Sequence, residues 1–188
     1  TFSVKRFRFC AQVHYIFGCG EGETIDRLLR RLSLEVPFVR LDSEGFDHVV
    51  VAGERFRIPN GLDKFRERLV RRYPQWRAPI LGYFAAVSAV RDELDRTDEL
   101  PRKLGPMELV RGAYRFRHLL RYMRSTLEDV YDAVGMPPLL RAVLAGQSGD
   151  YLLPPREVSF LLHVALVAGY DRGAYYPQNH FASLVDGL

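Results

Sequence analysis

The chain has 188 residues, of which 47% are hydrophobic and 27% are charged, with a formal net charge of +4. This composition is typical of a soluble globular protein and excludes a disordered chain. No stretch approaches the roughly 20 apolar residues that would cross a bilayer, and no signal peptide is present. Cys10 and Cys19 are too few for a disulfide framework and lack zinc-ligand spacing, which favours a reducing cytoplasm.

Residues 2–17 are predicted to form two short strands, because apolar and polar residues alternate along them with a period of two. The glycine-rich stretch 18–23 follows, between a strand and a predicted helix, where phosphate-binding loops occur. Its spacing fails the G-x-G-x-x-G pattern at Glu23, and two carboxylates would face a phosphate. A tight turn with Thr24 as the helix N-cap is therefore the favoured interpretation.

The next segment is predicted to alternate helix and strand. A helix over 24–32 has an apolar stripe. Residues 36–42 and 46–58 are expected to form an antiparallel meander, with turns at 43–45 and 52–54. Asn60 is predicted to cap a helix over 61–73.

From Pro74 onward the pattern is helical. One long helix is expected up to Leu94, and a second over 107–124, in which aromatic and aliphatic residues alternate with arginines. Two interpretations of this second helix remain open. It is either an interfacial helix whose guanidinium groups reach anionic headgroups, or a helix packed on its own protein with an arginine-rich outer face. No nucleic-acid-binding motif is recognisable, so a nucleic-acid partner is not expected.

The remaining helices are predicted from their start signals. Ser125 and Glu128 have the spacing of a capping box, and Pro138 is expected to open a helix that ends at Ala145. The prolines 154–155 are expected to start a central helix that contains the apolar run 160–168.

The last part of the chain is predicted to return to a sheet. Gly169 ends the central helix, a short strand stops at Pro177, and a further helix begins near Asn179. Because Thr1 enters a strand directly and Leu188 stops within an amphipathic pattern, the chain is interpreted as an internal segment of a longer protein.

The residue pattern itself indicates no catalytic group. The five histidines show no metal-ligand spacing, so no metal site is expected, and no nucleophile motif is present. His163 lies between apolar neighbours, as hydrogen-bonded core histidines do, and the tyrosines at 170, 175 and 176 are typical of core packing. These features indicate an apolar binding lobe without a reactive group of its own.

Three stretches, taken together, resemble one family. Phe9–Tyr15 reads FCAQVHY, Leu144–Pro155 reads LAGQSGDYLLPP, and Gly173–Pro177 reads GAYYP. They are similar, in the same order, to segments of flavoproteins of the phytoene desaturase, carotenoid isomerase and retinol saturase group. The chain departs from that group at Cys10, where aspartate is common, and at 178–180, where many members have two glycines.

The resemblance implies an α+β fold: an antiparallel sheet with a helical lobe, forming the substrate-binding portion that interrupts a Rossmann-like FAD-binding domain. Residues 1–188 would be the substrate-binding domain, and 178–188 would begin the return into the FAD-binding domain. The sheet would come from 2–17, 36–58 and 173–177, and the helical lobe from 61–170.

The resemblance further implies an FAD-dependent oxidoreductase that desaturates, saturates or isomerises double bonds of an apolar polyene or isoprenoid, such as a carotenoid or retinoid. This segment alone would be inactive. FAD would be bound mainly by residues outside the segment, with NAD(P) as a candidate electron donor or acceptor. The implied cofactor-binding residues are Gln12, Val13, His14, Tyr15 and Asn179, and the implied substrate-binding residues are His163, Tyr170, Tyr175 and Tyr176.

The expected partners are the apolar substrate, the remainder of the protein's own FAD-binding domain and a membrane surface. The expected location is cytoplasmic, peripheral on the inner face of the membrane. Two alternatives remain open: a non-enzymatic lipid-binding module, and an amine-oxidase-like flavoprotein with a smaller amine substrate.

Overall fold

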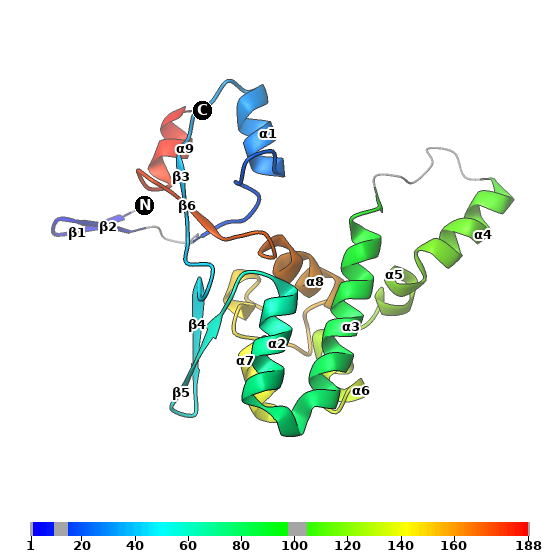
Figure 1. The fold of residues 1–188 in the computed structure, drawn as a ribbon. Helices are drawn as coiled ribbons and strands as arrows, with labels where there is room; N and C mark the ends of the chain where they lie inside the picture. Colours follow the sequence, from blue (N-terminus) through cyan, green and yellow to red (C-terminus); the bar gives the residue numbers. More distant parts are fainter. Residues whose placement is uncertain (1, 10–14, 98–104, 188) are drawn as a thin grey trace. The chain divides into compact units, whose positions relative to one another are not determined.

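The computed structural model describes residues 2–9, 15–97 and 105–187 (Figure 1). The fold is α+β, as predicted, with helices and short antiparallel strand pairs. The chain divides into two compact units. The strand unit comprises Thr1–Asp47, Arg57–Gly61 and Gly169–Leu188, and the helical unit comprises His48–Phe56 and Leu62–Ala168.

The strand unit begins with a hairpin of two three-residue strands, β1 (Phe2–Val4) and β2 (Phe7–Phe9). Lys5, in the turn between them, has a positive φ of 54°. The rings of Phe2 and Phe9 face each other across the pair and stack with centroids 5.3 Å apart. Both rings are exposed, so this hairpin is held by its own cross-strand contacts and covers no core.

The helix α1 (Thr24–Arg31) follows the glycine-rich stretch. Its amphipathic pattern buries Leu29, whereas Leu28 and Leu32 remain exposed. The predicted N-cap at Thr24 is wrong, because Thr24 is already helical and Glu23 occupies the cap position without a side-chain cap bond. The helix start is fixed instead by backbone bonds to Gly18, whose carbonyl accepts from the amides of Ile25 and Asp26.

The second strand pair joins distant parts of the chain. β3 (Phe38–Arg40) pairs antiparallel with β6 (Tyr175–Pro177), and Tyr175 also forms an isolated bridge with Ile16. The expected meander is therefore wrong in its first pairing, because β3 does not pair with the next strand along the chain. Pro177 lies opposite Phe38 at a position where the pair needs no amide hydrogen from it, and the Gln178 amide donates to the Pro37 carbonyl beyond it.

The hairpin of β4 (Asp47–Val51) and β5 (Glu54–Ile58) begins and ends in the strand unit, whereas its residues His48–Phe56 belong to the helical unit. Its turn residues Ala52 and Gly53 have positive φ angles of 50° and 78°, the signature of a tight hairpin turn of type I′. This turn was predicted correctly. The predicted cap at Asn60 is wrong, because within the described residues both of its amide atoms are buried without a hydrogen-bond partner.

Apart from the hairpin residues His48–Phe56, the described part of the helical unit is built mainly of helices (Figure 1). In chain order they are α2 (Leu62–Arg72), η1 (Pro74–Trp76), α3 (Arg77–Leu94), α4 (Pro106–Arg115), α5 (Arg117–Tyr122), α6 (Leu127–Ala133), α7 (Pro138–Leu144), η3 (Ser148–Asp150) and α8 (Phe160–Gly169), whose Gly169 already belongs to the strand unit. Side chains from α2, α3, α6, α7 and α8 form a core that excludes water. Its fully buried members include Leu69, Ile80, Val87, Leu127, Leu140, Phe160 and Val164.

Three predicted helix boundaries in this unit change. The helix expected over 107–124 is two helices, because Phe116 leaves helical geometry and is buried between α4 and α5. The capping box lies one residue later than predicted: the Thr126 hydroxyl accepts from the Asp129 amide, and the Asp129 carboxylate accepts from the Thr126 amide. The central helix α8 begins at Phe160 instead of at the prolines.

The final helix α9 (Ala182–Gly187) begins three residues after Asn179, because His180 has a φ of 70° that interrupts helical geometry. The uniformly apolar run of α8 is not buried on all sides: Phe160, His163, Val164 and Val167 are buried, whereas Leu162 is exposed. No helix in the described ranges combines the length and the apolar character needed to cross a membrane.

Candidate functional site

The strand unit contains a compact group of four aromatic rings, here called the aromatic cluster: Tyr15, Phe17, Phe46 and Tyr170. Tyr170 is buried at its centre, with ring centroids 5.2 Å from Tyr15, 5.1 Å from Phe17 and 5.3 Å from Phe46. The Tyr15 hydroxyl donates to the Asp47 carboxylate at 2.6 Å. Edge-to-face packing of this kind gives an apolar surface with fixed geometry.

Gly169 lies so close to the aromatic cluster that no side chain would fit at this position. A β-carbon at this position would lie 2.7 Å from the Phe17 ring, which is closer than real contacts allow. The end of α8 and the cluster are thus in direct van der Waals contact.

The tyrosines of β6 lie beside the glycine-rich loop. Tyr175 is buried, and a β-carbon at Gly20 would lie 2.6 Å from its hydroxyl oxygen. Burial, followed by the nearby Glu23 carboxylate, raises the pKa of Tyr175, so its hydroxyl is protonated at neutral pH. Tyr176 is half-buried and contacts the rings of His180 and Phe181.

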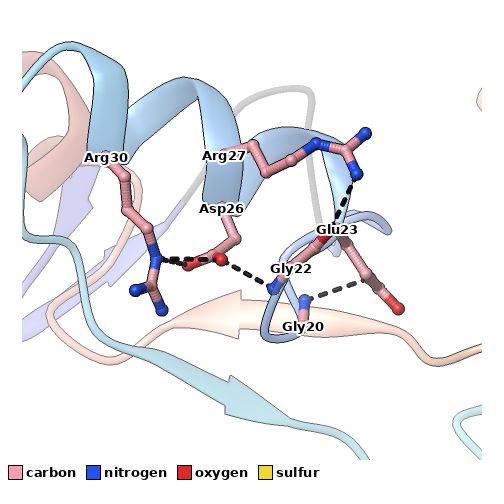
Figure 2. A network of polar contacts seen from close by, with 6 residues as sticks. All are labelled: Gly20, Gly22, Glu23, Asp26, Arg27 and Arg30. Carbon is pink, nitrogen blue, oxygen red and sulfur yellow. Dashed lines mark hydrogen bonds and ion pairs between the residues drawn. The ribbon is translucent and has the colours of Figure 1, made fainter.

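Figure 2 shows that two backbone amides of the glycine-rich loop donate to nearby carboxylates, one from the loop and one from α1. The Gly20 amide donates to Glu23 at 3.0 Å, and the Gly22 amide donates to Asp26 at 2.8 Å. Arg30 also binds Asp26, with its Nε 3.0 Å from the carboxylate, and Arg27 donates to the Gly22 carbonyl at 2.9 Å.

This loop therefore does not fit a dinucleotide pyrophosphate. Two amides that could bind a phosphate are occupied, and carboxylates would stand next to any added anion. The hydrogen bond from Gly22, together with Arg30, lowers the pKa of Asp26, so its negative charge is retained at neutral pH. The interpretation of this stretch as a tight turn is confirmed.

Cys19 lies on a pocket of about 700 Å³ between the loop, α1 and the approach to β3. Burial, with smaller effects from Glu23 and Asp26, raises the pKa of its thiol to about 12. The thiol is therefore protonated at neutral pH and cannot act as a thiolate nucleophile.

His163 occupies the core of the helical unit and is bound at both ring nitrogens. Its Nε2 lies 2.6 Å from the Tyr83 hydroxyl and its Nδ1 lies 3.1 Å from the Tyr151 hydroxyl. The Tyr83 hydroxyl is buried, so we assign it as the donor to Nε2. The Tyr151 hydroxyl is half-buried; it can accept the hydrogen of Nδ1 and donate its own to solvent. Burial lowers the pKa of His163 to about 4, which keeps the ring neutral. The expected core histidine is confirmed.

The structure brings some of the predicted site residues together. Tyr15 and Tyr170 are in ring contact, and Tyr175 is joined to the same segment through Ile16. Asn179 is exposed in the strand unit, and His163 lies in the core of the helical unit. Gln12, Val13 and His14 lie outside the described residues. The cofactor and substrate roles of all these residues stay predictions.

Two features were not predicted from the sequence. Phe17 and Phe46 join the aromatic cluster, although Phe46 was assigned only to a strand. Glu93 is buried at the end of α3, where its carboxylate accepts from the amides of His118 and Leu119 at 2.9 and 2.8 Å. In the sequence, Glu93 could have been recognised by its place three residues after Val90, on the apolar face of the helix.

Across the described part of the chain, no three metal-binding side chains come close enough to hold an ion. The strand unit instead offers the aromatic cluster, with Tyr170 buried at its centre and Phe17 exposed.

Comparison with known proteins finds similarity to all-trans-retinol 13,14-reductases of several species. The chain is 26% identical over 189 aligned residues to the all-trans-retinol 13,14-reductase of Rattus norvegicus, and 25% identical over 187 to that of Danio rerio. It resembles these reductases over nearly its whole length. The alignments cover 95% of this chain but only 30% and 31% of the relatives, so the chain spans about a third of their length. The reductase of Homo sapiens is similar to the same extent, at 26% identity. No family model matches the chain, and no solved structure matches it significantly.

Proposed function

We propose that this chain is the substrate-binding portion of an FAD-dependent oxidoreductase that acts on a double bond of an apolar polyene, with a retinoid as the first candidate. The observation that carries the proposal is the similarity of 95% of the chain to four all-trans-retinol 13,14-reductases. The names of these relatives specify reduction of one double bond of a conjugated, apolar alcohol. Such a substrate needs a dry, extended surface and few polar contacts.

The aromatic cluster and β6 would supply that surface. Tyr170 packs among three other rings, and the hydroxyl of Tyr15 is already bound to Asp47, so the cluster presents carbon edges to a ligand. Contact with an isoprenoid chain would exclude water from the reacting bond and hold its orientation. Tyr175 would extend this surface along the strand, and Tyr176, on the opposite face of β6 beside His180 and Phe181, would be a second contact for the substrate.

The flavin would be held mainly by polypeptide outside this chain. The glycine-rich loop does not fit the pyrophosphate, because Glu23 and Asp26 already occupy the amides of Gly20 and Gly22. When bound, FAD would supply the redox chemistry, and the residues described here would bind and orient the polyene. Reduction of a double bond consumes two electrons and two protons, so an electron donor is required, and NAD(P)H is one candidate.

The test uses the purified full-length protein that contains this chain, and its absorbance spectrum should show bound flavin. Under anaerobic conditions, all-trans-retinol should then yield a dihydro product with either dithionite-reduced protein or NADPH as the donor, resolved by chromatography and mass spectrometry. Flavin-free protein, or flavoprotein that leaves retinol and carotenoids unchanged with both donors, would contradict the proposal.

A variant pair links the aromatic cluster to the polyene. Tyr170→Ala should raise the apparent KM by roughly tenfold or more, because it removes a ring that would otherwise bury apolar substrate surface. Tyr170→Phe keeps the ring and should retain a KM close to that of the wild type. Phe7→Ala, an exposed aromatic position in the same unit, serves as the control. Equal KM values for Tyr170→Ala and Phe7→Ala would exclude the cluster from the substrate site.

A further inference from the structure

The helices α4 and α5 carry the positive charge of the chain. Residues 105–124 contain five arginines and one glutamate, a net charge of +4 that equals the net charge of all 188 residues. The five arginines at 111, 115, 117, 121 and 124 are all exposed. The rest of the chain is therefore neutral overall, and the charge excess belongs to this exposed segment.

The same helices expose apolar side chains in a regular pattern. On α4, Met107, Val110 and Tyr114 recur at spacings of three and four, which places them on one face, and they are 63%, 70% and 74% exposed. Leu120 and Met123 are likewise half or more exposed in the α5 segment. The described apolar side chains of this face are therefore in contact with solvent, as an interfacial helix requires.

The arginines flank these apolar side chains and do not oppose them. Arg111 and Arg115 follow Val110 and Tyr114 by one position each. Guanidinium groups also lie over aromatic rings, with Arg117 5.4 Å from the Tyr114 centroid. Aromatic and aliphatic groups beside arginines that can extend outward are the arrangement that interfacial helices use at lipid headgroups.

The surface is fixed to the helical unit on one side. The buried Glu93 carboxylate holds the first amides of α5 against the end of α3, and Phe116 is buried at the junction of α4 and α5. A pocket of about 430 Å³ opens here, with Tyr114, Arg115 and Arg117 among its lining residues. The two acidic side chains that line this pocket already have partners: Glu93 accepts from the amides of α5, and Asp92 pairs with Arg91 at 2.9 Å.

We infer that the α4–α5 surface docks on a bilayer that contains anionic phospholipid, with the apolar side chains entering the interface and the arginines binding lipid phosphates. Charge complementarity selects this occupant: a net charge of +4 beside exposed Val110 and Tyr114 suits an anionic headgroup layer above acyl chains. The inference is independent of the proposed redox chemistry, because vesicle binding requires neither flavin nor substrate.

The test is co-sedimentation of the purified protein with vesicles of phosphatidylcholine alone or with 30 mol% phosphatidylglycerol, the fraction chosen to give roughly the negative surface potential of a cytoplasmic leaflet. Binding should require the anionic lipid and weaken with added salt. The triple variant Arg117→Glu/Arg121→Glu/Arg124→Glu should lower partitioning by at least about a hundredfold, at roughly fivefold for each arginine near an anionic surface.

The control is Arg55→Glu/Arg71→Glu/Arg77→Glu, which changes the net charge equally at three exposed arginines elsewhere in the helical unit. It should retain most of the binding. A second variant, Val110→Ser/Leu120→Ser, keeps every charge and should also reduce binding, because it removes apolar contact. Equal losses in both arginine triples, no binding to either vesicle type, or self-association through α4 in place of vesicle binding would each overturn the inference.

Discussion

The two units differ in the size of their fully buried core, because the largest fully buried side chains lie in the helical unit. In the helical unit, Phe160 and other core residues are fully buried among five helices. In the strand unit, the β1–β2 hairpin leaves Phe2, Val4, Phe7 and Phe9 between 44% and 55% exposed. Helices of seven to eighteen residues present continuous apolar faces, whereas three-residue strand pairs have too little area to cover one another. The difference indicates that stability comes from the buried core of the helical unit, whereas exposed apolar side chains for further contacts lie on the β1–β2 hairpin and on α4 and α5.

The largest effect should come from removing a core ring. Phe160→Ala should destabilise the protein by about 3–5 kcal/mol, because it leaves a cavity among fully buried neighbours. Phe7→Ala should change the free energy of unfolding by less than about 0.5 kcal/mol, since that ring is already in water. Urea unfolding followed by circular dichroism measures both. Similar values for the two variants would remove the contrast between the units.

A somewhat smaller effect should appear as a dependence of stability on pH. Burial lowers the pKa of His163 from 6.5 to about 4 in the folded protein, so between these values the unfolded chain binds more protons. The free energy of unfolding should therefore fall as pH falls from 6.5 to 4, by about 3 kcal/mol from this residue. His163→Gln should show a shallower dependence over that window in urea titrations. Parallel pH profiles for the two proteins would mean that the buried ring does not titrate in this way.

The smallest effect distinguishes two adjacent hydroxyls at the start of α6. Thr126→Ala should cost about 1 kcal/mol, because its hydroxyl accepts from the Asp129 amide at 3.1 Å. Ser125→Ala should be nearly neutral, although the sequence pattern favoured Ser125 as the cap. The midpoints of thermal unfolding compare the two. A larger loss for Ser125→Ala would restore the predicted register.

Local patterns predicted most elements but not their partners. The type I′ turn at Ala52–Gly53 and the proline that opens α7 follow from backbone restrictions of single residues, so both were found. The pairing of β3 with β6 joins segments about 135 residues apart, and period-two alternation carries no information about which strand is the neighbour. The break at Phe116 was missed because arginines and aromatics continue with helical spacing through it.

The candidate site was predictable only through resemblance. Tyr15 and Tyr170 were selected because they lie near family-like motifs, and the structure places their rings in contact. Phe46 follows a turn glycine with no motif of its own, so its place beside Tyr170 depends on the tertiary fold. Glu93 was overlooked because a carboxylate at a core position is informative only once its partners, the amides of α5, are known.

The protonated, buried thiol of Cys19 has a practical consequence for spectroscopy. With its pKa raised to about 12, this side chain should resist maleimide at neutral pH, so it need not be replaced before a fluorophore is attached elsewhere. A Cys10→Ser background carrying Val110→Cys would then place a single polarity-sensitive dye on α4. A blue shift of its emission on adding vesicles would report insertion of that residue directly, in real time.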